Sequence, residues 1–289
     1  MFCIVKNAKH MSTPQTWFVT GASQGLGLTL VKRLLREGHQ VAATSRKQET
    51  LAEAVGTTSA AFLPLQVDLG SDASVQAALA QTISTFGHLD VVVNNAGYGI
   101  GGSIEELSDA ETRQAFDVNV FGTLNVVRQA LPQLRLQGAG HIINISSIAA
   151  LAGATGWAVY SATKAAVSAF TEVLAQDVAS FGIKATVVEP GGFRTNFLTA
   201  ESLTLPQQPI AAYEDIRASH AKYLQMNGAQ GGDPEKAAAA IIQITTEANP
   251  PLRLLLGQDA YQRATHKLDA LAQNFQAWQA LTVSTGFAE

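Results

Sequence analysis

Tyr160 and Lys164 stand four positions apart in a stretch with helical character, residues 158–181. At that spacing two side chains lie on the same face of a helix, one turn apart. A free tyrosine titrates at about pH 10, and a neighbouring ammonium would favour the phenolate and lower that pKa. The pair therefore has the chemistry of a general acid/base, with Lys164 as the charge that tunes Tyr160.

Ser147 adds a hydroxyl donor to this pair. It follows an apolar segment with strand character, residues 141–145, and would stand at the carboxyl edge of a sheet, where open α/β sheets bind their ligands. A fixed donor there could stabilise negative charge on a substrate oxygen while Tyr160 delivers the proton. These residue types suit proton transfer to or from a substrate oxygen whose charge changes during the reaction.

A glycine-rich turn, residues 20–27, offers a place for a dinucleotide. It follows the first strand-like run and opens into an amphipathic helix. Glycines let the backbone approach a ligand, and a helix N-terminus presents free N–H groups and a positive dipole end to a pyrophosphate. In doubly wound folds this first turn binds dinucleotides. The predicted contacts in the turn are Gly21, Ser23, Gln24, Gly25, Leu26 and Gly27.

The end of the second strand-like run indicates which dinucleotide binds. In NAD-preferring sites an acidic residue holds the ribose 2′-hydroxyl, and that position here is Ser45. Ser45 carries no negative charge that would repel a 2′-phosphate. The adjacent Arg46 can make a charge-assisted contact with that phosphate, and Lys47 is expected to help. The sequence thus favours NADP, with NADPH preferred over NADH. The alternative is that Arg46 and Lys47 are an ordinary solvated pair.

The elements that must position these residues alternate as strand then helix. Strands are expected at 16–20, 40–44, 61–67, 89–93, 141–145, 183–188 and 252–256, and helices at 25–37, 48–55, 73–86, 109–136, 158–181 and 233–246. Runs of consecutive apolar residues, such as Val91 to Val93, indicate strands covered on both faces. The predicted fold is α/β: a single-domain, doubly wound parallel sheet, Rossmann-like, of about seven strands with helices on both faces.

No linker or repeat divides the chain, so residues 14–289 are expected to form one dinucleotide-binding catalytic domain. Residues 1–13 are expected to be a disordered leader, because Met11 could equally be the natural start. Residues 192–232 are expected to be a mobile flap over the substrate, or else an ordered insertion. Residues 258–289 are expected to form a polar, helical tail.

Seven motifs in register carry a resemblance to the short-chain dehydrogenase/reductase family. They are Thr20-Gly21-x-x-x-Gly25-x-Gly27, Asp68-Leu69, Asn94-Asn95-Ala96-Gly97, Asn119, Ser147, Tyr160-x-x-x-Lys164 and Pro190-Gly191-x-x-x-Thr195. Singly they are weak, because a tyrosine four residues before a lysine often arises by chance. Together they imply an oxidoreductase that acts on CH–OH or C=O groups with a nicotinamide coenzyme.

The resemblance also implies roles for single residues. The implied catalytic tetrad is Asn119, Ser147, Tyr160 and Lys164. In it Asn119 links a water chain to Lys164, and Lys164 also holds the nicotinamide ribose. Asp68 is implied to contact the adenine amino group, and Thr195 the carboxamide. The other implied coenzyme contacts are Ser45, Arg46, Leu69, Asn94, Asn95, Ala96, Gly97, Tyr160, Lys164, Pro190, Gly191 and Phe193. Gln24 replaces a basic residue found in some NADP-preferring members, so the NADP prediction depends on Arg46.

Each catalytic candidate also has an ordinary structural explanation. Ser147 could cap the next segment, Asn119 could be a buried helix residue satisfied by backbone, and Tyr160 could simply pack. Their joint occurrence favours catalysis. The rival function is a non-catalytic, NADP-sensing regulatory binding protein, which would be expected to lose the tyrosine or the lysine.

The substrate pocket is expected to be apolar, which suits an uncharged ketone, aldehyde or secondary alcohol. Its expected lining is Tyr98, Ile100, Ile148, Leu151, Trp157, Phe193, Phe197 and Leu198. Arg194 is the one nearby cation that could hold an acid group, and it could equally be a solvated loop residue. The resemblance implies a homodimer or homotetramer that pairs through the helices at 109–136 and 158–181.

Composition restricts the remaining function classes. Of the 289 residues 47% are hydrophobic and 15% charged, enough for a large core. The net charge of −4 comes with no lysine–arginine cluster for nucleic acid or an anionic membrane. Cys3 is the only cysteine, which excludes an internal disulfide and a multi-thiolate metal site, so no metal is expected. With no secretory or membrane-spanning segment in the sequence, a cytoplasmic location is expected.

Overall fold

Seven parallel strands form the central sheet of the structure, a computed structural model that describes residues 14–287. The expected leader, residues 1–13, lies outside the described residues. In spatial order the strands are β3 (Phe62–Gln66), β2 (Gln40–Ser45), β1 (Thr16–Val19), β4 (Val91–Asn94), β6 (Gly140–Ile145), β7 (Ile183–Pro190) and β9 (Arg253–Leu256). Every neighbouring pair is parallel, which confirms the predicted α/β, Rossmann-like sheet.

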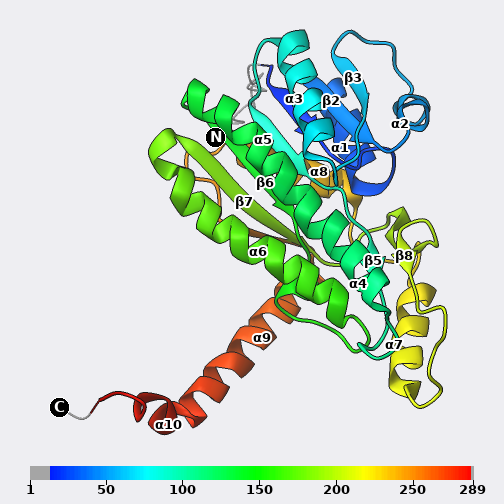
Figure 1. Cartoon of the computed structure of the whole chain (residues 1–289), viewed down its shortest axis with the longest axis vertical. Helices are drawn as coiled ribbons and strands as arrows, with labels where there is room; N and C mark the ends of the chain where they lie inside the picture. Colours follow the sequence, from blue (N-terminus) through cyan, green and yellow to red (C-terminus); the bar gives the residue numbers. More distant parts are fainter. Residues whose placement is uncertain (1–13, 288–289) are drawn as a thin grey trace, which may run out of the picture.

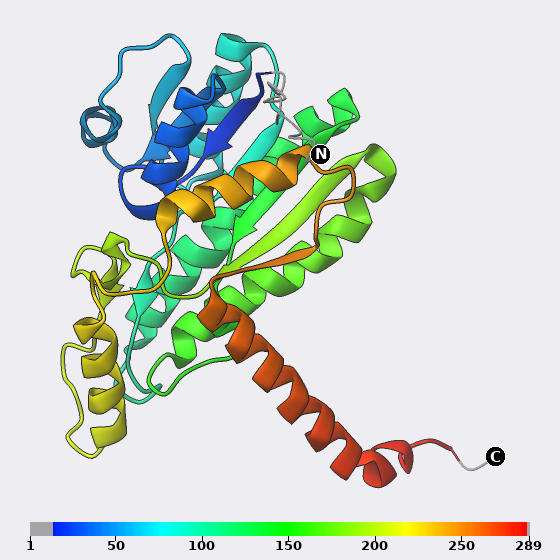
Figure 2. The ribbon, with the colours of Figure 1, turned by 180° about the vertical axis from the view of Figure 1, so that it is seen from behind.

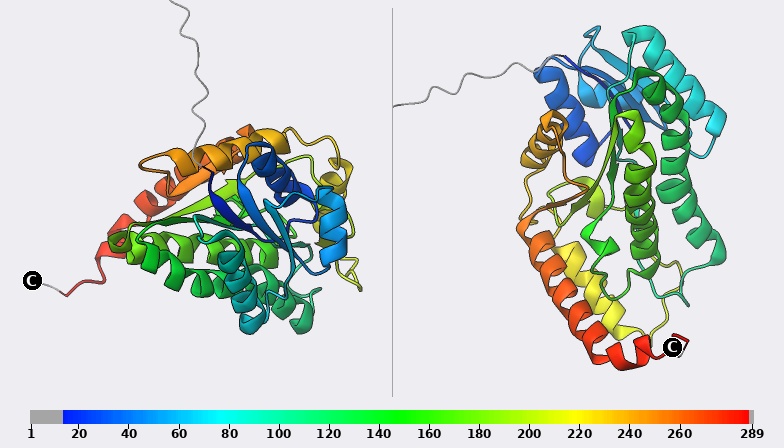
Figure 3. Two further views of the ribbon diagram at one scale, coloured as in Figure 1. Left: turned by 90° about the horizontal axis from the view of Figure 1, so that it is seen from above. Right: turned by 90° about the vertical axis from the view of Figure 1, so that its left-hand side faces the viewer.

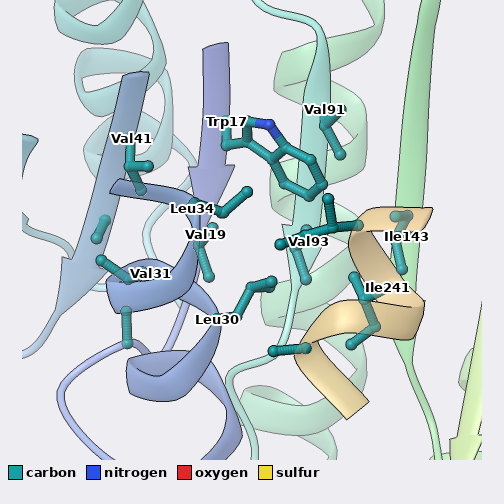
Figure 4. Packing of buried hydrophobic residues seen from close by; sticks show 14 of the residues in the cluster. Trp17, Val19, Leu30, Val31, Leu34, Val41, Val91, Val93, Ile143 and Ile241 are labelled. Carbon is teal, nitrogen blue, oxygen red and sulfur yellow. The ribbon is translucent and has the colours of Figure 1, made fainter. Parts of the chain in front are cut away.

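Helices cover both faces of this sheet (Figure 3). One face carries α1 (Gly25–Arg36), α2 (Gln48–Val55) and α8 (Pro234–Thr246), and the other carries α3 (Asp72–Phe86), α5 (Gly122–Gln137) and α6 (Ala158–Val178). Because side chains alternate along a strand, Trp17 and Val19 enter the first core and Phe18 the second. Figure 4 shows the first core around Trp17 and Val93. Consecutive apolar residues in the strands thus correspond to two buried faces.

The crevice for a ligand forms where β1 and β4 lie side by side. These strands are neighbours although β2 and β3 come between them in the chain, and the helices that follow them cover opposite faces. Such a switch point leaves an opening at the carboxyl ends of the strands. The two strand ends are tied there by the Thr20 hydroxyl, which accepts hydrogen bonds from the backbone N–H groups of Asn95 (3.0 Å) and Ala96 (3.1 Å).

The helix expected over residues 109–136 is interrupted. It consists of α4 (Asp109–Phe116), a π-helical turn η1 (Asp117–Phe121) and α5. Ser108 and Glu111 start α4 with a capping box, in which each side chain accepts a hydrogen bond from the other residue's backbone N–H. A π turn carries one extra residue and is frequent at functional sites. Here it contains Asn119.

Residues 192–232 hold secondary structure that the sequence analysis missed. A short strand β8 (Leu203–Thr204) pairs with β5 (Gly99–Ile100), and a helix α7 (Glu214–Gln225) follows. Figure 1 shows α7 and β8 beside β5 and α4, at the end of the sheet that carries the crevice. The mobility expected for this segment stays a prediction.

Glu106 fastens this segment to the body of the protein. Its fully buried carboxylate accepts hydrogen bonds from the backbone N–H groups of Ser103 (2.8 Å) and Ile210 (2.9 Å), and it pairs with Arg217 of α7. Burial alone would raise the pKa of Glu106, but these hydrogen bonds outweigh it and lower the pKa to about 2.

Glu106→Gln should therefore change the acid sensitivity of the fold. A carboxyl with a lowered folded-state pKa loses its contribution as pH falls from its ordinary value of 4.5 toward about 2, because unfolding then takes up a proton. We expect the variant to be less stable by about 1–3 kcal/mol at pH 7, and the difference to shrink across that acid range. Thermal unfolding of both proteins at a series of pH values measures this. A difference that does not change with pH would contradict the assignment.

The chain ends in α9 (Gln258–Ala277) and α10 (Gln279–Val283), as a helical tail was expected. Figures 1 and 2 show this arm projecting away from the sheet and its helices. Among residues 14–287 no helix is both long and apolar enough to cross a membrane.

Candidate active site

A cleft of about 1430 Å³ lies along the carboxyl ends of the strands. Segments that follow β1, β2, β3, β4, β6 and β7 line it, together with α7 and the first turns of α9. The glycine turn and the Tyr160–Lys164 pair both face this one cleft.

The structure brings Ser147, Tyr160 and Lys164 together. Ser147 follows β6, while Tyr160 and Lys164 lie one turn apart on α6, and the Ser147 side chain is close enough to the Tyr160 phenol to lower its pKa. The Lys164 ammonium donates a hydrogen bond to the Ile145 carbonyl (3.0 Å), and Nζ lies 6.0 Å from the centre of the Tyr160 ring. A phenol, an ammonium and a hydroxyl thus meet at one wall of the cleft.

Burial governs the protonation of this pair. It raises the pKa of Tyr160 to about 12, opposed by the Ser147 side chain, and it lowers the pKa of Lys164 to about 8. The net shift of Tyr160 is therefore opposite to the lowering expected from Lys164, because desolvation of the phenol is the larger effect. At neutral pH Tyr160 is a protonated phenol, the form that can donate a proton.

Asn119 lies behind the cleft wall. Its Oδ1 accepts a hydrogen bond from the Tyr98 backbone N–H (3.0 Å), and its Nδ2 donates to the Tyr98 carbonyl (3.0 Å) and the Thr163 hydroxyl (3.2 Å). A Cβ added to Gly97 would lie 3.0 Å from the Asn119 Oδ1 and 3.3 Å from the Lys164 Nζ. Asn119 therefore fixes the strand end after β4 against the helix that carries Tyr160 and Lys164.

The turn after β1 fits a pyrophosphate. Gly21 has φ +64°, and a Cβ there would lie 2.6 Å from the Ala96 Cα. Gln24, the residue that caps α1, makes no side-chain cap hydrogen bond, so the N–H groups of the first helical turn are left for a ligand in the cleft. Instead, Gln24 Nε2 donates to the Ser202 hydroxyl (2.8 Å) across the cleft.

Gly21→Ala should cost more stability than the same change at Gly38. Both glycines have positive φ, but a Cβ on Gly38 meets nothing within 4 Å, whereas one on Gly21 collides with Ala96. We expect Gly38→Ala to cost about 1 kcal/mol and Gly21→Ala about 1–3 kcal/mol more, with loss of NADPH binding only in the latter. Urea unfolding and a fluorescence titration with NADPH test this, and equal costs would contradict the close approach of the two strand ends.

At the adenine end, Ser45, Arg46, Asp68 and Leu69 all line the cleft. The Ser45 hydroxyl donates to the Lys47 carbonyl (2.7 Å) and accepts from the Lys47 N–H (3.0 Å), which shapes the turn that presents Arg46. The side chain of Arg46 is exposed, and Lys47 is not part of the lining. Lys47 is therefore a poor candidate for the helper role expected of it.

Most of the other predicted residues also line the cleft. For the coenzyme these are Ser23, Gly25, Leu26, Asn95, Ala96, Gly97, Pro190, Gly191, Phe193 and Thr195, and for the substrate Tyr98, Ile148, Trp157, Phe197 and Leu198.

Two predicted coenzyme contacts do not face the cleft. The Asn94 side chain is buried in the sheet, where its Nδ2 donates to Asn144 Oδ1 (2.9 Å). Gly27 packs α1 against the neighbouring strand end, since a Cβ there would lie 2.4 Å from the Asn95 Nδ2. Both residues build the site and do not line it.

Three residues expected near the substrate lie elsewhere. Ile100 belongs to a buried cluster beneath the cleft, and Leu151 packs in the cluster that holds the start of α9. Arg194 Nε donates to the Gln230 carbonyl (2.7 Å) and is not part of the lining. The cation expected to hold an acid group is thus engaged with backbone.

The sequence analysis missed the contributions of α7 and α9 to the lining: Lys222, Tyr223, Met226, Asp259 and Arg263. The Asp259 carboxylate accepts from the Gly192 N–H (2.8 Å), and Arg263 donates to the Ala152 carbonyl. No motif marks these residues, because their place depends on how the two helices return to the sheet. Within residues 14–287 no three His, Cys, Asp or Glu side chains gather as metal ligands.

The family model described as short chain dehydrogenase matches residues 15–205, about two thirds of the chain. The chain belongs to the short-chain dehydrogenase/reductase family. It is 35% identical to "Oxidoreductase BOA17" of Botryotinia fuckeliana over 93% of this chain and 98% of that protein. It is 37% identical to a 3-ketodihydrosphingosine reductase of Bacteroides thetaiotaomicron over 84% of this chain and 88% of that protein.

Solved structures agree with this membership. A short-chain dehydrogenase from Streptomyces avermitilis has a TM-score of 0.86 and 35% identity, covering 96% of this chain and 100% of that one. A serine dehydrogenase complexed with NADP⁺ has a TM-score of 0.71 and 27% identity, covering 84% of this chain and 94% of that one. As a member of this family the protein is an oxidoreductase, and its coenzyme is of the nicotinamide type.

Proposed function

We propose that this short-chain dehydrogenase is an NADP(H)-dependent oxidoreductase that moves hydride reversibly between nicotinamide C4 and a carbonyl or alcohol carbon of an apolar small molecule. The observation that carries the proposal is the meeting of Ser147, Tyr160 and Lys164 at one wall of the cleft that also contains the glycine turn. This arrangement places a proton donor, a second hydroxyl and a cation that could hold a ribose beside a turn that fits a pyrophosphate.

In the reducing direction the coenzyme supplies the hydride that forms the new C–H bond. The Ser147 hydroxyl donates a hydrogen bond to the substrate oxygen, and Tyr160 transfers its proton to that oxygen as negative charge develops there. Lys164 would hold the nicotinamide ribose, and its ammonium would stabilise the phenolate left on Tyr160. Asn119 would position Lys164 and support the relay that returns a proton from solvent. Oxidation of an alcohol follows the same path in reverse.

The preference for NADP is proposed from the end of β2. Ser45 places no carboxylate beside the ribose, and Arg46 lines the cleft with its side chain exposed. A guanidinium can form a charge-assisted, bidentate contact with a 2′-phosphate, which NADH lacks.

The substrate is proposed to be an uncharged molecule with a large apolar part. Aromatic and aliphatic side chains surround Tyr160, with the rings of Trp157 and Phe197 centred 6.1 Å and 5.7 Å from its ring. Lys222 and Arg263 share the lining with Asp215 and Asp259, so cations do not dominate it. A 3-ketodihydrosphingosine reductase among the relatives acts, by its name, on a ketone of this general kind.

The proposal is tested by following NADPH and NADH consumption with a panel of ketones and aldehydes graded by chain length, and the reverse reaction with the matching alcohols. We expect turnover with NADPH and an apolar carbonyl. Tight NADPH binding without turnover on any carbonyl or alcohol would favour the rival function, an NADP-sensing regulatory protein. The cytoplasmic location and pairing through α4, α5 and α6 remain predictions of the sequence analysis.

A further inference from the structure

The C-terminal helix α9 carries an apolar stripe that begins on the body of the protein and continues beyond it. Ala260 and Ala264, 0% and 2% exposed, pack in a cluster with Ile148 of the cleft wall. Further along, Leu268 is 55%, Phe275 66% and Trp278 59% exposed. Figures 1 and 2 show that the later part of α9, and α10, extend away from the sheet and its helices, so the rest of the protein does not cover these side chains.

The spacing of the stripe is that of a helix–helix seam. After Ala264, apolar residues recur in steps of four and three at Leu268, Leu271, Phe275 and Trp278. With 3.6 residues per turn these four side chains and Ala264 fall within roughly 80° around the helix axis. Steps of three and four are the a/d pattern by which helices pair. The prediction of a polar tail is therefore wrong for this face.

We propose that Leu268, Leu271, Phe275 and Trp278, the arm stripe, pair with the arm stripe of a second copy of this chain. A seam of this spacing is self-complementary, so a two-fold axis can bring two identical stripes together. Residues 270–286 contain no charged side chain, which leaves nothing for an electrostatic partner to recognise. Helices that lie on membranes usually carry Lys or Arg on their polar face, and this arm has none after Lys267.

The exposed area is sufficient for such a contact. The arm stripe and the neighbouring Leu281, 62% exposed, would together bury on the order of 600 Å² per copy. A stable interface of standard size buries about 800 Å² per partner. Flanking side chains of α9 and α10 can supply the difference.

Light scattering across a concentration series tests the pairing, with a double variant and a matched control. Leu268→Glu/Phe275→Glu places two charges in the stripe, and Gln262→Glu/Gln273→Glu places two charges on the opposite side of the same helix. We expect wild type and control to have the same mass at equal concentration. The stripe variant should have half that mass, with a dissociation constant for pairing raised at least tenfold. NADPH binding retained by the stripe variant shows that its body is folded.

Tryptophan emission gives a second readout. Trp17 and Trp157 are buried in the body, so a change on dilution reports on Trp278. Wild type should shift to the red as it dissociates, and the stripe variant should be red-shifted at every concentration. Equal masses for wild type and stripe variant would overturn the proposal. An assembly that dissociates only in the Val173→Glu variant, which changes an exposed position of α6, would also overturn it. A monomeric wild type whose Trp278 is buried only with phosphatidylcholine vesicles would assign the stripe to a membrane and likewise overturn it.

Discussion

Tyr160→Phe should lower kcat by about 10²–10⁴-fold while NADPH binding is retained. The phenyl ring fills the same buried space, so what is lost is the proton that Tyr160 gives to the substrate oxygen and its interaction with Ser147. The rate of NADPH oxidation with a saturating carbonyl substrate measures kcat, and quenching or transfer of fluorescence on titration with NADPH measures Kd.

Tyr261→Phe is the matched control for this variant. Tyr261 lies on the exposed surface of α9 and is not part of the cleft lining, so the same loss of a hydroxyl should leave kcat unchanged. A Tyr160→Phe enzyme with unchanged kcat would refute the acid/base role. A variant that lost NADPH binding together with turnover would instead indicate that Tyr160 holds the coenzyme site in shape.

Arg46→Ala should weaken NADPH binding by about 10–100-fold and leave NADH binding nearly unchanged. A hydrogen bond to a charged group contributes about 1.5–3 kcal/mol, and only NADPH has the 2′-phosphate that Arg46 can meet. Titration of the purified protein with each coenzyme gives the two dissociation constants. Raising the salt concentration should weaken NADPH binding more in wild type than in the variant.

Lys47→Ala is the control for Arg46→Ala. It removes the same charge from the neighbouring position, but Lys47 does not line the cleft, so its effect on NADPH should be several-fold smaller. Equal losses of NADPH and NADH binding in Arg46→Ala would mean that no 2′-phosphate is held at the end of β2.

The sheet could be predicted from the sequence because its signals are local. Runs such as Val91 to Val93 are apolar at consecutive positions, which requires cover on both faces, and the alternation of strands and helices then leaves few topologies. The position of the cleft wall could be predicted from the same alternation of strands and helices. Gly21, Ser147 and Asn95 come shortly after parallel strands, and the carboxyl ends of these strands lie at one edge of the sheet.

Features that depend on packing could not be predicted in this way. A π turn adds one residue to a helix without changing its composition, so the break at Asn119 left no pattern in residues 109–136. Asp259 and Arg263 reach the cleft only because α9 starts beside β9, which no spacing in the sequence reveals. The high pKa of Tyr160 arises from burial in the folded chain, whereas helical spacing showed only the nearby Lys164.

The transfer of a labelled hydride tests the central claim most directly. NADPH carrying two deuterium atoms at C4 is incubated with the enzyme and a carbonyl substrate from the panel, and the alcohol product is analysed by mass spectrometry. The proposed function predicts one deuterium on the carbinol carbon of each product molecule, with the hydroxyl proton coming from solvent. The Tyr160→Phe variant should form this product only at its lowered rate. An alcohol without deuterium at that carbon, or coenzyme oxidised without any reduced product, would contradict it.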